Sequence, residues 1–154
     1  MRSAGPHCEA DSDQDQAHHH VVEVDLADAL GRDHSDPAQP LGPLADAVAN
    51  ISAAAMLVLG LRSSDLDLLS RGLEDRIHQP RRRDLYPRSM EIVDSACELG
   101  ALGATISGAG PTVLVWTTWQ DAGNVASALE EDCAGWAEVR RLPFSPLGAD
   151  VPEL

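Results

Sequence analysis

The glycine-rich segment between residues 100 and 112, with the sequence GALGATISGAGPT, constrains the fold of this 154-residue chain more than any other feature. Apolar residues precede it, ending at Ile106, and resume after it at Val113. This pattern predicts a strand near 102–107, a glycine turn, and a second strand near 111–117. Two interpretations of the turn remain open. Gly108 and Gly110 supply the positive φ angles of a tight hairpin, and they also leave backbone N–H groups accessible to an anion such as phosphate.

The middle of the chain carries the spacing of three successive helices. Apolar residues at steps of three and four predict a first helix near 44–60. A capping-box pattern at Ser64 and Asp67 predicts a second helix that continues to Pro80. A third helix is expected near 87–100. The apolar stripes are Leu44, Val48, Ile51, Ala55 and Val58 in the first helix and Leu66, Leu69, Leu73 and Ile77 in the second.

The rest of the pattern completes an α+β domain. A helix is predicted near 121–132 and a final strand near 137–142. Helices combined with short antiparallel strands pack as a layer against a sheet. With 44% apolar residues, the chain has enough material for one core of ordinary size. We therefore expect helices packed on one face of a small antiparallel sheet.

The first 40 residues differ from the rest in charge. They contain nine acidic residues against two arginines, within a chain whose net charge is −14. Such a stretch buries too little apolar surface to offset the entropy of ordering, so residues 1–40 are expected to form a mostly disordered leader. A domain over 41–145 and a tail over 146–154 follow. The exception in the leader is Val21–Leu26, where apolar and acidic residues alternate and predict an added edge strand.

Charge, apolar run length and cysteine spacing exclude several classes of function. The net charge of −14 argues against nucleic acid as a partner, because its phosphates repel an acidic surface. We expect no 18-residue apolar span and no signal peptide, and therefore a cytoplasmic protein that does not enter a membrane. The three cysteines lack a CxxC spacing, and the consecutive histidines at 18–20 cannot all face one ion. No metal site is predicted.

Three short segments follow one another along the chain in a recognisable order. They are Leu44–Ser52 (LADAVANIS), Glu74–Pro80 (EDRIHQP) followed by three arginines, and Gly103–Thr112 (GATISGAGPT). Together they resemble the homoserine kinases of the GHMP kinase superfamily. The resemblance covers residues 43–145, corresponds to the C-terminal portion of such a kinase, and implies a ferredoxin-like sandwich. The phosphate-loop motif that this superfamily carries in its N-terminal domain does not occur in the 154 residues.

The resemblance implies transfer of the γ-phosphoryl group of ATP, with Mg²⁺, onto the side-chain hydroxyl of L-homoserine, a step of threonine biosynthesis. Arg82 matches the arginine implicated in holding the substrate carboxylate in this family. A guanidinium suits that task because it binds a carboxylate through two parallel hydrogen bonds. Asn50 is a second candidate for substrate binding, although it could equally cap or cross-link its helix. The residues expected to pack beside the phosphate loop are Ser107, Gly108, Ala109 and Gly110.

One position departs from the family pattern. Ala53 stands where homoserine kinases typically carry a second carboxylate-binding arginine. This departure keeps open a second hypothesis, a non-catalytic ferredoxin-like relic that binds an amino acid or another subunit. The main ligands of ATP and Mg²⁺ would lie outside this chain, so no catalytic residue is assigned and the chain alone is not expected to be active. The expected protein partner is a second copy or a separate N-terminal half.

Polar residues around the arginines are expected to be structural. His78 lies at a predicted helix end, where it would face the helix dipole. Glu74 and Asp75 are interpreted as a solvated helical face. The kinase resemblance further predicts that Arg82 and the turn at 107–110 face a common cleft, although 25 residues separate Arg82 from Ser107.

Overall fold

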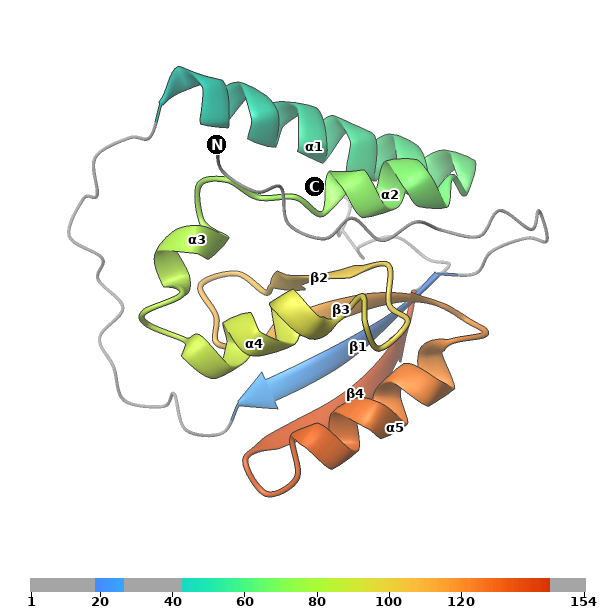
Figure 1. Ribbon diagram of the computed structural model, residues 1–154. Coiled ribbons are helices and arrows are strands. Elements are labelled where there is room, and N and C mark those ends of the chain that lie inside the picture. Colours follow the sequence, from blue (N-terminus) through green and yellow to red (C-terminus); the bar gives the residue numbers. More distant parts are fainter. Residues whose placement is uncertain (1–18, 27–42, 145–154) are drawn as a thin grey trace, which may run out of the picture.

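The computed structural model describes residues 19–26 and 43–144, whose elements are labelled in Figure 1. The predicted leader and tail over 1–18, 27–42 and 145–154 lie outside the described residues, so the boundaries at 41 and 145 stay predictions. The strands are β1 (His19–Leu26), β2 (Gly103–Ile106), β3 (Val113–Thr118) and β4 (Ala137–Pro143). The helices are α1 (Leu44–Ser63), α2 (Leu66–Gly72), α3 (Gln79–Arg82), α4 (Pro87–Ser95) and α5 (Ala122–Asp132).

The four strands form one antiparallel sheet in the order β2-β3-β1-β4. The prediction of an edge position for Val21–Leu26 was wrong, because β1 pairs with β3 on one side and with β4 on the other (Figure 1). Val22 lies opposite Val115 of β3, and Val24 lies opposite Val139 of β4. The alternation was interpreted correctly as a strand, but it does not say which neighbours the strand has.

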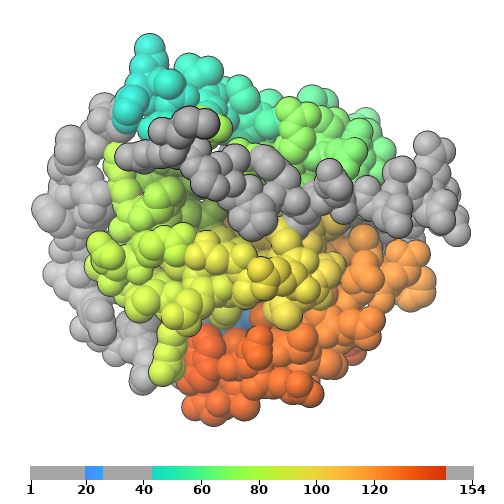
Figure 2. Space-filling view, viewed as in Figure 1, coloured from blue at the N-terminus to red at the C-terminus, as the bar shows by residue number. Residues whose placement is uncertain are grey.

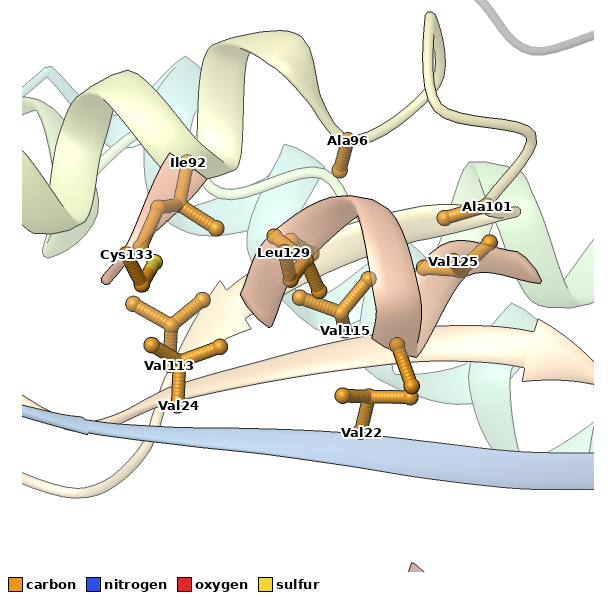
Figure 3. Close-up of a cluster of buried hydrophobic side chains, with 12 residues drawn as sticks. Val22, Val24, Ile92, Ala96, Ala101, Val113, Val115, Val125, Leu129 and Cys133 are labelled. Atoms are coloured by element: carbon orange, nitrogen blue, oxygen red, sulfur yellow. The ribbon is translucent and has the colours of Figure 1, made fainter. Parts of the chain in front are cut away.

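The main core lies between this sheet and helices α4 and α5 (Figure 3). Val22 and Val24 are fully buried there, although they belong to the acidic N-terminal segment. Side chains from all four strands and both helices meet in one cluster, which confirms the predicted α+β class with helices packed on a small antiparallel sheet. The buried members of the cluster are Val22, Val24, Ile92, Ala96, Ala101, Ala104, Val113, Val115, Val125, Ala126, Leu129 and Cys133.

Helices α1 and α2 form a separate antiparallel pair beside the sheet (Figures 1 and 2). A second cluster of Leu69, Leu73 and Leu102, with Trp116 packed against it, joins this pair to the β2–β3 side. The two helices approach each other through glycines. A Cβ atom on Gly60 would lie 2.5 Å from the Leu69 nitrogen, and one on Gly72 would lie 2.4 Å from the Leu57 nitrogen. The backbones therefore touch at two points where no side chain fits.

The apolar stripe predicted for the first helix does not face the core. Leu44 is 81% exposed and Ile51 is 70% exposed, while Val48, Val58 and Leu59 are exposed as well. The opposite side of α1, with the small residues Ala53 and Gly60, packs inward.

The expectation that the chain holds no apolar span was also wrong. α1 is long and apolar enough to cross a membrane by length and composition alone, and only 11% of its continuous 18-residue apolar stretch is buried.

The second helix is shorter than the sequence predicts. α2 ends at Gly72, and residues 73–78 form an irregular segment before α3, whose first turn contains Pro80. Asp65 caps α2 by accepting a hydrogen bond from the Leu68 amide at 2.9 Å, in place of the predicted Ser64. Ser64 instead takes a left-handed conformation that ends α1. The interruption after Gly72 matters because it creates the separate short helix that carries Arg82.

Candidate functional site

Three side chains from α3 and α4 hold the loop formed by residues 107–112, which joins β2 to β3. The Arg82 Nε atom donates to the Ala109 carbonyl at 3.1 Å. The Gln79 Oε1 atom accepts from the Ile106 amide at 3.0 Å, at the end of β2. The Ser89 hydroxyl donates to the Pro111 carbonyl at 2.7 Å. The predicted meeting of Arg82 with the glycine turn is therefore present as a direct hydrogen bond.

The 107–112 loop has the form of a hairpin connection. The Ser107 amide donates to Thr112 at 2.8 Å, and the Gly110 amide donates back to Ser107 at 2.9 Å. Gly108 has a φ angle of +55° and Gly110 has one of +88°, as a tight glycine turn requires. Within the described residues, the amides of Gly108 and Ala109 donate to no protein acceptor. The loop thus satisfies both interpretations of its glycines, a hairpin and a pair of amides open to an anion.

The two glycines of the loop meet different surroundings. A Cβ atom on Gly110 would lie 2.9 Å from the ring of Tyr86, whereas a Cβ on Gly108 would meet nothing within 4 Å. Gly110 is therefore required by packing as well as by its φ angle. Gly108 is exposed and leaves open space, so its backbone can be approached from outside the protein.

Asp75 organises the segment that leads into α3. Its carboxylate accepts the backbone amides of Ile77 at 2.8 Å, His78 at 3.0 Å and Gln79 at 2.8 Å. It also accepts the Asn50 Nδ2 group of α1 at 2.6 Å. The interpretation of Asp75 as part of a solvated helical face was wrong, because the segment is not helical and the carboxylate is half-buried. Burial raises the pKa of Asp75, but the hydrogen bonds from His78, Asn50, Ile77 and Gln79 outweigh it and hold the pKa below 3.8.

Asn50 takes the cross-linking role that the sequence left open. Besides donating to Asp75, its Oδ1 atom accepts from the Arg76 backbone amide at 2.9 Å. Both polar atoms of the amide side chain are thus engaged by the segment after α2. A substrate contact by Asn50 stays a prediction, and it would have to share atoms already used by the protein.

The other residues singled out in the sequence lie around this centre without joining it. Ala53, where the resemblance leads one to expect a second arginine, is only 4% exposed on the inner side of α1. His78 has an exposed side chain, and its backbone amide is what Asp75 binds. Arg83 pairs with Asp94 of α4 through two hydrogen bonds of 2.6 and 3.0 Å. Unlike Arg82, none of these three residues has a hydrogen bond to the 107–112 loop among the described contacts.

Sequence reasoning missed Asp75, Gln79 and Ser89. A signal for Asp75 was available, since an aspartate just before a short helix is a common acceptor for the helix's free amides. It was missed because the apolar spacing through Ile77 suggested an uninterrupted helix. Gln79 and Ser89 form contacts across 27 and 22 positions, which no local pattern indicates.

No cluster of candidate metal ligands occurs in the part of the chain that the structure describes. Within residues 19–26 and 43–144, no three histidine, cysteine, aspartate or glutamate side chains gather closely enough to hold an ion. The candidate site consists of the Arg82 guanidinium and two open amides on the hydrogen-bonded 107–112 loop, groups that favour an anionic ligand.

A comparison with known protein families matches the region that contains the sheet strands β2 and β3 and the 107–112 loop. Residues 57–135, about half of the chain, match the family described as GHMP kinases C terminal. The chain therefore belongs to the GHMP kinase C-terminal family. The matched region contains the segment from α2 to α5 and thus Arg82 and the whole 107–112 loop.

The individual relatives compared with the chain are homoserine kinases. The chain is similar to homoserine kinase of Prochlorococcus marinus, at 35% identity over 102 residues, which cover 66% of this chain and 32% of that protein. Homoserine kinase of Moorella thermoacetica is 47% identical over 73 residues, covering 47% of this chain and 25% of the relative. The crystal structure of homoserine kinase from Cytophaga hutchinsonii superposes with a TM-score of 0.69 at 27% identity, covering 81% of this chain and 41% of that one. The chain thus spans about a third of the length of the curated relatives it matches.

Proposed function

We propose that this chain is the substrate-side domain of an enzyme that transfers the γ-phosphoryl group of ATP to the hydroxyl of L-homoserine. The observation that carries the proposal is the hydrogen bond between Arg82 and Ala109, because it joins the arginine of the kinase resemblance to the glycine loop of the same resemblance. The similarity to three homoserine kinases supports the choice of substrate. A cytoplasmic location follows as part of the same proposal.

The proposed chemistry of this domain is positioning. The Arg82 side chain has further N–H groups beyond the one bound to Ala109, and a substrate carboxylate would bind there. The open amides of Gly108 and Ala109 would donate hydrogen bonds to the oxygens of a neighbouring phosphate and stabilise its negative charge. Fixing a hydroxyl in line with a phosphoryl group supplies much of the catalysis in such transfers.

ATP and Mg²⁺ fit this chain only in part. The described carboxylates do not gather into a set that could hold Mg²⁺, so its ligands would come from the rest of the kinase. When bound, the ion would neutralise charge on the phosphates that are transferred and released. The residues of this chain that would contribute are the loop amides at Gly108 and Ala109.

The exposed face of α1 is the proposed docking surface for that remaining part. Leu44, Val48, Ile51, Ala55 and Val58 alternate at steps of four and three, the spacing by which one helix packs on another. About two thirds of the length of the first matched relative lies outside the region that matches this chain. An uncovered apolar stripe on α1 is what a domain of those relatives, in the same or another polypeptide, would bury.

A second function is favoured by one specific observation. Ala53 is buried where the resemblance expects a substrate-binding arginine, so one of the usual carboxylate contacts is absent. A domain with this change could retain amino-acid or subunit binding without catalysis. The two functions differ in whether the complete assembly turns over ATP.

A chimera tests the choice between them. The part of Moorella thermoacetica homoserine kinase that precedes the match would be fused before residue 19, so that β1 is kept. Release of ADP that depends on L-homoserine supports the kinase proposal. A folded chimera that binds L-homoserine without releasing ADP supports the non-catalytic function, and one that neither binds nor reacts removes homoserine as the ligand.

A further inference from the structure

The Asp75 carboxylate, which lies outside any helix or strand, accepts hydrogen bonds from four donors. One carboxylate gathers three consecutive amides, at Ile77, His78 and Gln79, and one side-chain amide, at Asn50. Residues 77–79 lead directly into α3. The position and direction of this four-residue helix are therefore fixed by Asp75, because so short a helix has little stability of its own.

The first and last residues of α3 both contact the candidate site. Gln79 accepts the Ile106 amide at the end of β2, just before the 107–112 loop, and Arg82 donates to Ala109 within the loop. Asp75 is thus bonded to α1 through Asn50 and, through the backbone of α3, to both contacts on the loop. The path runs through hydrogen bonds of 2.6 to 3.1 Å.

The geometry points to Asp75 as the positioning residue of this site, with Asn50 acting through it. Asp75 sets α3 so that Gln79 and Arg82 meet the loop, and Asn50 ties that arrangement to α1. The inference rests on the proposed function only for the identity of the ligand. It assigns Asn50 a role inside the protein, where the resemblance suggested a contact to substrate.

The ionised carboxylate is what this position needs. Its Oδ1 atom accepts from Asn50, Ile77 and His78, and its Oδ2 atom accepts from Gln79. An asparagine offers a single acceptor oxygen and turns an NH₂ group toward amide donors. At least one backbone amide is then left without its partner, and the start of α3 loosens.

The test compares Asp75→Asn with Asp67→Asn, which makes the same chemical change at an exposed carboxylate of α2. Amide hydrogen exchange by NMR is measured at Ile106 and, as a reference for the whole fold, at Val22 and Val115. We expect Asp75→Asn to speed exchange at Ile106 about tenfold or more, with little change at the reference amides. Asp67→Asn should change none of them.

Several outcomes are decisive. Equal acceleration at Ile106, Val22 and Val115 would mean that Asp75 only stabilises the fold, and unchanged exchange at Ile106 in a folded Asp75→Asn variant would overturn the inference outright. If Asp75→Asn does not fold, Asn50→Ala removes one of the four donors and should give a smaller acceleration at the same amide. An unaltered Ile106 in Asn50→Ala would then count against the proposal.

Kinetics of the chimera separate this inference from the proposed function. In an active chimera, Asp75→Asn should raise KM for L-homoserine about tenfold with a smaller change in kcat, since a misplaced Arg82 weakens binding first. A chimera that is inactive in every form, but whose Ile106 amide responds to Asp75→Asn, would refute the kinase proposal and leave the positioning role intact. An active chimera whose KM ignores Asp75→Asn would refute the positioning role.

Discussion

The Nε atom of Arg82 lies 3.1 Å from the carbonyl oxygen of Ala109, 27 positions later in the chain. This hydrogen bond uses one of the five N–H donors of the guanidinium. Among the described residues the structure gives Arg82 no other partner, so its terminal nitrogens remain for a ligand. Arg82 is held by its bond to Ala109 and keeps donors for a ligand, and the open amides of Gly108 and Ala109 belong to the same loop. Together these groups favour the binding of an anion.

Replacing Arg82 should weaken substrate binding in the chimera. Arg82→Ala removes a charge-assisted contact of about 1.5–3 kcal/mol, which corresponds to a rise in KM for L-homoserine of roughly ten- to a hundredfold. Arg140→Ala is the control, because Arg140 pairs with Glu138 on the exposed strand β4. Equal KM values for the two variants would remove Arg82 from the site.

The contact of α1 with α2 predicts opposite effects at two helical glycines. Gly72→Ala places a methyl group against the Leu57 backbone at 2.4 Å and should destabilise the protein by about 1–3 kcal/mol. Gly123→Ala in α5 meets nothing within 4 Å and should leave stability unchanged or raise it by up to ~1 kcal/mol. Urea unfolding followed by circular dichroism measures both. The packing described for α1 and α2 is wrong if Gly72→Ala is as stable as the parent.

The interior position of β1 predicts where a shortened chain still folds. The sequence predicts a domain over 41–145, but a chain starting at residue 41 lacks Val22 and Val24, which are fully buried. Each lost valine removes roughly 1.5–3 kcal/mol of burial, before the lost strand pairing is counted. A version that begins at residue 19 should unfold cooperatively, and one that begins at residue 41 should not. Equal urea midpoints would contradict the observed strand order.

Asp75 should make stability depend on pH in the acid range. Its folded pKa lies below the ordinary value of 3.8, so the ionised form is favoured by folding. That contribution is complete above the unfolded pKa and is lost as the pH falls through the folded value. The unfolding free energy of the parent minus that of Asp75→Asn should be constant from pH 7 to about 5 and should shrink below about pH 4. A difference that grows on acidification would reverse the assigned shift.

The exposed stripe of α1 should be dispensable for folding and required for docking. Ile51→Glu changes a residue that is 70% exposed, so stability should shift by less than about 0.5 kcal/mol. Binding to the separately expressed remainder of a homoserine kinase, measured by calorimetry, should fall. Trp119→Gln alters an exposed apolar residue outside α1 and should leave that binding unchanged. Binding of the parent to lipid vesicles, lost in Ile51→Glu, would show instead that the stripe meets a membrane.

Periodicity predicted the kind and place of most elements but not their surroundings. The α1 spacing identified a helix correctly and assigned its covered side wrongly, because large apolar residues are usually buried. Here the inner side carries Ala53 and Gly60 together with the partly buried Leu57 and Leu61. At Gly60 the backbones of α1 and α2 touch, which no larger residue would allow. Likewise, the alternation in β1 indicated a strand, while its place between β3 and β4 depends on pairings more than 80 residues away in sequence.

The candidate site was predicted in part for a different reason. Arg82 and the 107–112 loop were joined through resemblance to a family, and the hydrogen bond between them is consistent with that link. Asp75 could not be placed while residues 73–78 were expected to be helical, because its four donors exist only where the helix is broken. A predicted element boundary therefore decided whether the site's central carboxylate could be recognised.

The reciprocal close approaches at Gly60 and Gly72 limit how α1 and α2 can move against each other. Because the helix backbones touch at both points, one helix cannot slide or rotate past the other unless the two separate. Movement of the α1–α2 pair relative to the sheet would also act on the irregular residues 73–78, because Asn50 of α1 is hydrogen-bonded to Asp75 and to the Arg76 amide. A partner that binds the outer side of α1 would therefore also affect residues 73–78, which contain Asp75. Through α3 it would affect the position of Arg82 at the loop.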